Sequence, residues 1–164
     1  MRVYLASPLG FADSTRAFMD HLMRELASDA VELVNPWDKS DDNDALRQAM
    51  AIPHHDERVA AMAAINHRIA AWNEAAIRSS DAVVAVLDGV DVDSGTASEI
   101  GFAYALGKRV IGLRTDFRLA GDNLGAVVNL QVQHFIDASG GRIVRDVAAL
   151  RALLDDGNAA SIRP

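Results

Sequence analysis

Short hydrophobic runs alternate along the chain with longer stretches that have helical periodicity. Five runs rich in β-branched residues are expected to be strands: Val3–Ala6, Val31–Val34, Ala82–Leu87, Arg109–Leu113 and Gln131–Ile136. Two of them, Ala82–Leu87 and Val110–Leu113, are hydrophobic at consecutive positions, which is typical of strands covered on both faces. The alternation predicts an α/β fold, with a five-stranded parallel sheet and helices on both of its faces.

Four helices are predicted from hydrophobic side chains that recur every three or four residues. They span approximately Ser14–Ala27, Asp56–Ser79, Ser94–Leu106 and Val144–Leu154. Gly107 suits a left-handed cap at the end of the third helix. We therefore expect one domain over residues 1–154 and a frayed C-terminal tail over residues 155–164.

The polar and acidic segment Asn35–Asp44 fits none of these elements. It is longer than the 2 to 6 residues that usually connect strands and helices in such folds. It could be a solvated surface loop or a lid over a binding site. The lid is suggested by Trp37, which follows a strand end, where open α/β sheets bind ligands.

The composition excludes several kinds of chemistry. The 164 residues contain no cysteine, so thiol catalysis, disulfides and cysteine-bound zinc are excluded. With 16 Lys and Arg against 23 Asp and Glu, the net charge is −7, and no basic cluster is present. Nucleic acids and anionic membranes require a positive surface, so neither is an expected partner. The expected partner is a small molecule or another copy of the chain.

No signal peptide is visible, and no hydrophobic run approaches the roughly 20 residues that span a bilayer, so we expect a cytoplasmic protein. His54, His55 and His67 lack the spacing of metal ligands, and no metal site is expected. Neither glycine-rich phosphate-binding motif occurs, so no nucleotide cofactor is expected either.

The segment Asp88–Gly101, between a central strand and a helix, contains the strongest candidate for chemistry. It supplies four carboxylates, and Glu99 is expected in the first helical turn, ionised at neutral pH and usable as a nucleophile. Gly95 and Gly101 flank Glu99 and would allow close approach by a ligand. In the alternative interpretation, Thr96 and Glu99 form a capping box with a purely structural role.

Three segments, Tyr4–Phe11, Asp93–Gly101 and Asn129–Leu130, resemble the nucleoside 2-deoxyribosyltransferase family. The resemblance covers roughly residues 3 to 136. It implies a flavodoxin-like sheet and transfer of a 2-deoxyribosyl group between nucleobases. The motif loops contain acidic residues rather than the arginine or Ser/Gly nest that a 5′-phosphate requires, so nucleosides are expected in preference to nucleotides. The resemblance also implies a covalent sugar intermediate on Glu99, with ping-pong kinetics and net retention. A nucleoside hydrolase and a non-catalytic flavodoxin-like binding module are the alternatives.

The resemblance also implies roles for other residues. Tyr4 would orient the nucleophile, and Asp93 would contact the sugar hydroxyls, although Asp93 could instead cap a helix. Gly89 and Trp37 are further expected substrate contacts. Asn129 would complete the site of a neighbouring subunit, which implies a homo-oligomer.

Asn73 departs from the commonest family pattern, which has an aspartate that handles the departing base. An amide donates and accepts hydrogen bonds but cannot deliver a proton as a carboxylic acid does. The substitution therefore affects how the leaving base is protonated or which bases are accepted. Alternatively, Asn73 is an amide on the helix surface.

Overall fold

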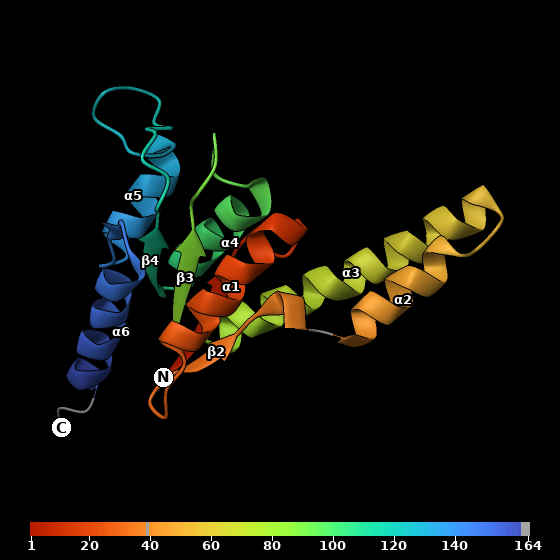
Figure 1. Cartoon of the computed structure of the whole chain (residues 1–164), viewed down its shortest axis with the longest axis horizontal. Coiled ribbons are helices and arrows are strands. Elements are labelled where there is room, and N and C mark those ends of the chain that lie inside the picture. The colour runs from red at the N-terminus through yellow and green to blue at the C-terminus, as the bar shows by residue number, and fades with distance from the viewer. Residues whose placement is uncertain (39, 162–164) are drawn as a thin grey trace.

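The computed structural model describes residues 1–38 and 40–161 (Figure 1). In chain order, its elements are β1 (Arg2–Ala6), α1 (Asp13–Leu26), β2 (Glu32–Val34), a 3-10 turn (Pro36–Asp38), α2 (Ser40–Met50), α3 (His55–Ser79), β3 (Ala82–Val86), α4 (Ser94–Ala105), β4 (Arg109–Leu113), α5 (Leu130–Ala138), β5 (Ile143–Val144) and α6 (Val147–Ser161).

The five strands form one parallel sheet in the order β2-β1-β3-β4-β5. The chain passes from β1 to β2 on one side and then to β3 on the other, so the direction of winding reverses between β1 and β3. In sheets of this kind, ligands bind beyond the carboxyl ends of the strands at such a reversal. The predicted α/β fold with a five-stranded parallel sheet is confirmed.

Helices cover both faces of the sheet, as predicted. Because successive side chains of a strand point to opposite faces, Tyr4 and Ala6 lie in one core and Val3 and Leu5 in the other. The first core is closed by α3, α4 and α5, and the second by α1 and α6. Tyr4 therefore faces the same layer as α3 and α4.

The predicted fifth strand, Gln131–Ile136, is wrong, because these residues belong to helix α5. Asn129 caps this helix by accepting hydrogen bonds from the backbone N–H groups of Gln131 and Val132, and Val132 and Ile136 lie four residues apart on its buried side. The fifth strand is instead the short β5, which includes the residue where the last helix was predicted to begin.

The polar segment Asn35–Asp44 is not a loop. Pro36–Asp38 form the 3-10 turn and α2 begins at Ser40, with Lys39 outside the described residues. Acidic residues in the first turn suit the positive end of a helix, which explains how so polar a segment is helical. Together α2 and the first half of α3 form an arm that extends away from the sheet (Figure 1).

An ion pair joins the two helices of this arm. Nε and Nη2 of Arg68, on α3, lie 3.0 and 2.9 Å from Oδ1 of Asp42, on α2. The Asp42 side chain is only 9% exposed, so the pair is shielded from solvent on the carboxylate side. At the other end of the chain, α6 extends to Ser161, into the segment predicted as a tail. Within the described residues, no helix is long and hydrophobic enough to cross a membrane.

Candidate active site

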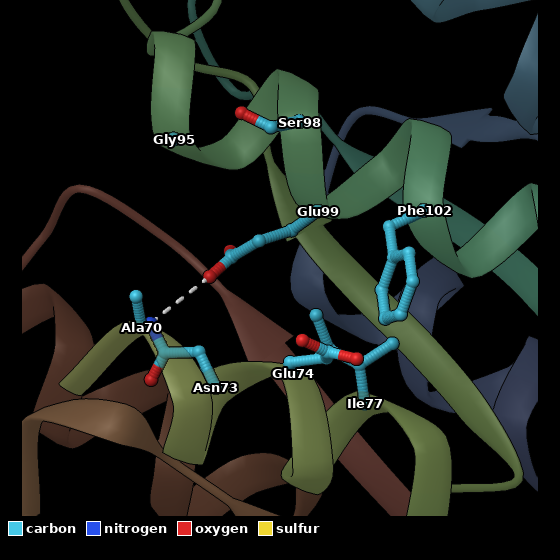
Figure 2. A pocket seen from close by; sticks show the side chains of 8 residues that line it. All are labelled: Ala70, Asn73, Glu74, Ile77, Gly95, Ser98, Glu99 and Phe102. Atoms are coloured by element: carbon cyan, nitrogen blue, oxygen red, sulfur yellow. Dashed lines mark hydrogen bonds between the residues drawn. The ribbon is translucent and has the colours of Figure 1, made fainter. Parts of the chain in front are cut away.

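Two adjoining cavities lie beyond the carboxyl end of β1, between α3 and α4. The main cavity has a volume of about 360 Å³ and is lined by Ser7, Phe11, Pro36, Trp37, Leu46, Asn66, Ile69, Asn73, Asp93, Gly95, Thr96 and Glu99. The side cavity, of about 390 Å³, is lined by Ala70, Asn73, Glu74, Ile77, Gly95, Ser98, Glu99 and Phe102 (Figure 2). Both volumes fall in the range of small-molecule sites. Glu99 lies in the wall that the two cavities share.

Two side chains hold the Glu99 carboxylate in place. The Tyr4 hydroxyl, at the centre of β1, donates a hydrogen bond of 2.6 Å to Oε1 of Glu99. The Nδ2 group of Asn73, on α3, donates to the same oxygen at 3.4 Å, and Figure 2 shows Glu99 reaching from α4 toward Asn73. Residues 4, 73 and 99 therefore meet at one carboxylate, although they come from three separate elements.

Burial raises the pKa of Glu99 from 4.5 to about 7. The Tyr4 hydrogen bond acts in the opposite direction, and the nearby charge of Asp93 raises the pKa further. Burial and the Glu99 charge also hold the pKa of Tyr4 well above its usual range, so its hydroxyl stays protonated and donates. The expectation that Glu99 is ionised at neutral pH rested on its place in the helix, and burial instead favours the neutral carboxyl.

Helix α4 begins at Ser94, which places Glu99 in its second turn, away from the helix terminus. The capping interaction comes from Asp93, whose Oδ2 accepts hydrogen bonds from the backbone N–H (2.9 Å) and the hydroxyl (3.3 Å) of Thr96. Glu99 is therefore not the acidic member of a capping box. Asp93 caps the helix and also lines the main cavity, so the two interpretations of this residue are compatible.

Trp37 also lines the main cavity. Its indole N–H donates to the Ser7 carbonyl at 2.9 Å, and its ring meets Phe11 edge to face at a centroid distance of 4.5 Å. The ring lies directly over Gly10, where a Cβ atom would overlap it. Trp37 is thus held by the loop after β1, and the side chain predicted to contact substrate lines the cavity.

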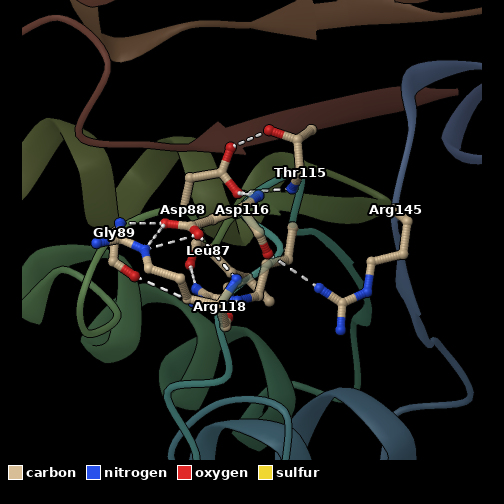
Figure 3. Close-up of polar contacts among 8 residues, drawn as sticks. Leu87, Asp88, Gly89, Thr115, Asp116, Arg118 and Arg145 are labelled. Atoms are coloured by element: carbon tan, nitrogen blue, oxygen red, sulfur yellow. Dashed lines mark hydrogen bonds and ion pairs between the residues drawn. The ribbon is translucent and has the colours of Figure 1, made fainter.

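Asp88 and Gly89 lie beside the site without lining either cavity. Asp88 accepts hydrogen bonds from the backbone N–H groups of Thr115 (2.6 Å) and Asp116 (2.8 Å), as Figure 3 shows. In return, the buried Arg114 donates to the Gly89 carbonyl at 3.1 Å. Gly89 has a φ of +129°, which favours glycine. These residues join the loop after β3 to the loop after β4 and so support the segment that leads to Asp93.

Asn129, at the start of α5, lines neither cavity of its own chain. Besides capping α5, its Nδ2 group lies 3.5 Å from Oδ1 of Asp122. The structure thus brings four of the predicted residues, Tyr4, Trp37, Asn73 and Asp93, to one site around Glu99, and leaves Gly89 and Asn129 outside it.

Sequence reasoning missed several residues of the main cavity. Leu46 belongs to the unpredicted helix α2, so no sequence signal placed it. Asn66 and Ile69 precede Asn73 by seven and four residues in the predicted long helix, which puts them on the same helical face. That spacing could have identified them. No group of three or more histidine and acidic side chains within residues 1–38 and 40–161 is placed to hold a metal ion.

The chain is similar in fold to several solved structures. A conserved protein from Enterococcus faecalis V583 is 25% identical, with a TM-score of 0.68 over 95% of this chain and 98% of that one. A 2-desoxiribosyltransferase from Leishmania mexicana is 23% identical, with a TM-score of 0.64 over 94% and 97%. A CMP N-glycosidase from Clostridium botulinum is 20% identical, with a TM-score of 0.56 over 94% and 98%. A search of curated proteins gave no match.

The family comparison is more specific than these likenesses of fold. Residues 3–131 match the family model described as nucleoside 2-deoxyribosyltransferase. The match includes β1 with Tyr4, the helix with Asn73 and the loop and helix with Asp93 and Glu99. Since it covers most of the chain, this protein belongs to the nucleoside 2-deoxyribosyltransferase family.

Proposed function

We propose that this protein transfers the 2-deoxyribosyl group of a 2′-deoxyribonucleoside to another nucleobase, with Glu99 as the nucleophile. The observation that carries the proposal is the Glu99 carboxylate, held at 2.6 Å by the Tyr4 hydroxyl in the wall of a cavity of nucleoside size. Breaking an N-glycosidic bond builds positive charge on the anomeric carbon, which an adjacent carboxylate stabilises.

The reaction proceeds in two displacements. First, a Glu99 oxygen bonds to C1′ of the sugar while the N-glycosidic bond breaks and its electron pair leaves with the base. Then a nitrogen of the incoming base bonds to C1′ while the C1′–O bond breaks, the Glu99 carboxylate leaves with the electron pair, and the N–H proton of the base passes to water. Two inversions give net retention and ping-pong kinetics. Asn73 is not an acid at neutral pH, so the departing base takes its proton from water.

Hydrolysis is a second candidate function. Glu99 also lines the side cavity, which gives water a route to the intermediate that is separate from the main cavity. A related fold belongs to a CMP N-glycosidase, a hydrolytic activity by its name. In this reaction water replaces the incoming base in the second displacement.

One incubation separates these functions. The protein is mixed with a 2′-deoxyribonucleoside and a different free base, and both bases, both nucleosides and free deoxyribose are followed by chromatography. We expect the new nucleoside to form. Free deoxyribose alone would favour hydrolysis, and no change in any of these compounds would favour a non-catalytic binding module.

We also propose that the active form is a homo-oligomer in which Asn129 completes the site of a neighbouring subunit. Asn129 stands at the end of a loop with exposed hydrophobic side chains, Phe117, Leu119 and Leu124. Hydrophobic surface of this kind is commonly buried at protein interfaces. The Asn129 amide caps α5 and lines neither cavity of its own chain.

Subunit mixing tests this arrangement. Asn129→Ser keeps a helix cap but removes the amide, so it should fold and have low activity. Glu99→Gln should be inactive. When the two variants are unfolded together and refolded as mixed dimers, one site of each heterodimer contains both intact residues, and activity should return to about a quarter of the wild-type value. If the mixture is no more active than its separate components, Asn129 does not act across subunits.

A further inference from the structure

We infer that Asn66 binds the edge of a purine base that lies farthest from the sugar, and thereby makes this enzyme selective for purines. This inference rests on the proposed function and concerns the same main cavity.

Asn66, Ile69 and Asn73 lie on one face of α3 and line the main cavity. Asn73 marks the reacting end of the cavity, because its Nδ2 group lies 3.4 Å from Oε1 of Glu99. Asn66 precedes it by seven residues, which corresponds to about 10 Å along a helix axis. The two amides therefore stand at opposite ends of one wall, with the hydrophobic Ile69 between them.

Other residues that line the main cavity suit a flat ring. They include Trp37, Phe11 and Leu46, and Trp37 is fixed by its hydrogen bond to the Ser7 carbonyl. Aromatic and aliphatic side chains stack on the faces of nucleobases without distinguishing among them. Discrimination must come from polar groups at the ring edges, and Asn66 is such a group at the end remote from Glu99.

The Asn66 side chain is available for this contact. It is exposed, and no hydrogen bond joins it to another residue of the described chain. Arg68, two residues after Asn66 on α3, forms an ion pair with Asp42 on α2 and so joins the two helices of the arm close to Asn66. The amide is therefore presented to the cavity from a helix that is itself held in place.

The separation of the two amides favours a two-ring base. With the sugar at Glu99, a pyrimidine ends near Asn73 and Ile69, whereas the six-membered ring of a purine extends farther along α3 toward Asn66. A carboxamide has both a donor and an acceptor. By turning over, it pairs with the amino group and ring nitrogen of adenine or with the oxo group and ring N–H of hypoxanthine.

The test compares base preference in three variants. Asn66→Ala removes the contact, and alanine is the best helix former, so the variant should fold. Asn66→Asp keeps the shape but only accepts hydrogen bonds, which suits the two adjacent N–H donors of guanine. His67→Ala is the matched control, because His67 is the next residue of α3 and lines neither cavity. The acceptors are adenine, hypoxanthine, guanine, cytosine and thymine.

We expect the wild type to prefer purines. Asn66→Ala should lower kcat/KM for adenine and hypoxanthine by about 5- to 150-fold, the effect of the two lost hydrogen bonds, and leave kcat/KM for pyrimidines unchanged. Asn66→Asp should raise kcat/KM for guanine relative to that for the other purines. His67→Ala should have the same base preference as the wild type.

Several results would overturn the inference. A wild-type preference for pyrimidines would do so, as would an equal effect of Asn66→Ala on every base or no effect on any. If Asn66→Ala fails to fold, Asn66→Asp provides the test. An unchanged ratio of kcat/KM for guanine to kcat/KM for adenine in that variant would also overturn the inference. These outcomes all require transfer by the wild type. Absence of transfer with any base would contradict the proposed function instead.

Discussion

Replacing Glu99 with glutamine should lower kcat by at least about 10³-fold without unfolding the protein, because an amide of the same shape cannot form the sugar intermediate. Glu99→Gln keeps an acceptor for the Tyr4 hydroxyl, which donates to Oε1 at 2.6 Å in the wild type. Glu57→Gln is the matched control, since Glu57 lies in the first turn of α3, outside both cavities. Steady-state kinetics with a deoxynucleoside and a second base measure both variants.

The same substitution should make the protein more stable at alkaline pH. The pKa of Glu99 is raised to about 7 in the folded protein, from 4.5, so the wild type gains stability from the neutral carboxyl below pH 4.5 and loses it as the pH rises through 7. Glutamine does not titrate. The free energy of unfolding of Glu99→Gln, taken relative to that of the wild type, should therefore be about 3 kcal/mol higher at pH 8 than at pH 4.

A loss of stability at every pH, with specific activity retained by the folded fraction, would contradict this prediction. It would mean that Glu99 is a structural residue of α4. Denaturant unfolding followed by circular dichroism at several pH values provides the measurement.

The second large effect concerns the pH dependence of turnover. Because the reaction needs the ionised carboxylate, kcat of the wild type should rise with pH through about 7. Tyr4→Phe removes the hydrogen bond that lowers the pKa of Glu99, so this rise should move to higher pH. At pH 7 we expect kcat to fall by about tenfold, the effect of one hydrogen bond to a charged group.

Asp93→Asn should move the rise of kcat with pH to lower pH, opposite to the effect of Tyr4→Phe. The Asp93 charge raises the pKa of Glu99, and asparagine removes that charge while it still caps α4. The two variants together separate an electrostatic effect from a general disturbance of the site. Such a disturbance would lower kcat in both variants but would not move their profiles of kcat against pH in opposite directions. An identical pH profile in wild type, Tyr4→Phe and Asp93→Asn would show that Glu99 is not the group whose ionisation controls turnover.

Two features could be predicted from the sequence: the parallel sheet, and the proximity of Tyr4 to the loop that leads to Asp93. The runs Ala82–Leu87 and Arg109–Leu113 are strands buried on both faces, which leaves a hydrophobic signal at consecutive positions. Parallel strands bring their carboxyl ends to one edge, and this is why Tyr4 and the loop that leads to Asp93 lie together.

Other parts depended on interactions that hydrophobic patterns do not contain. Helix α2 is polar in its first turn and is held by packing on α3 and by the ion pair of Asp42 with Arg68. The segment Gln131–Ile136 resembles a strand by composition, but the cap at Asn129 starts a helix there. The raised pKa of Glu99 was not predicted either, because it comes from burial of the carboxyl beside Tyr4 and not from the place of Glu99 along α4.

The most direct test of Glu99 as the nucleophile is mass spectrometry of the protein after a rapid acid quench during turnover of a deoxynucleoside without an acceptor base. We predict a mass increase of one deoxyribosyl group, located by proteolysis on the peptide that contains Glu99 and absent from Glu99→Gln. An adduct on a different residue, or undiminished transfer by Glu99→Gln, would contradict the proposed mechanism.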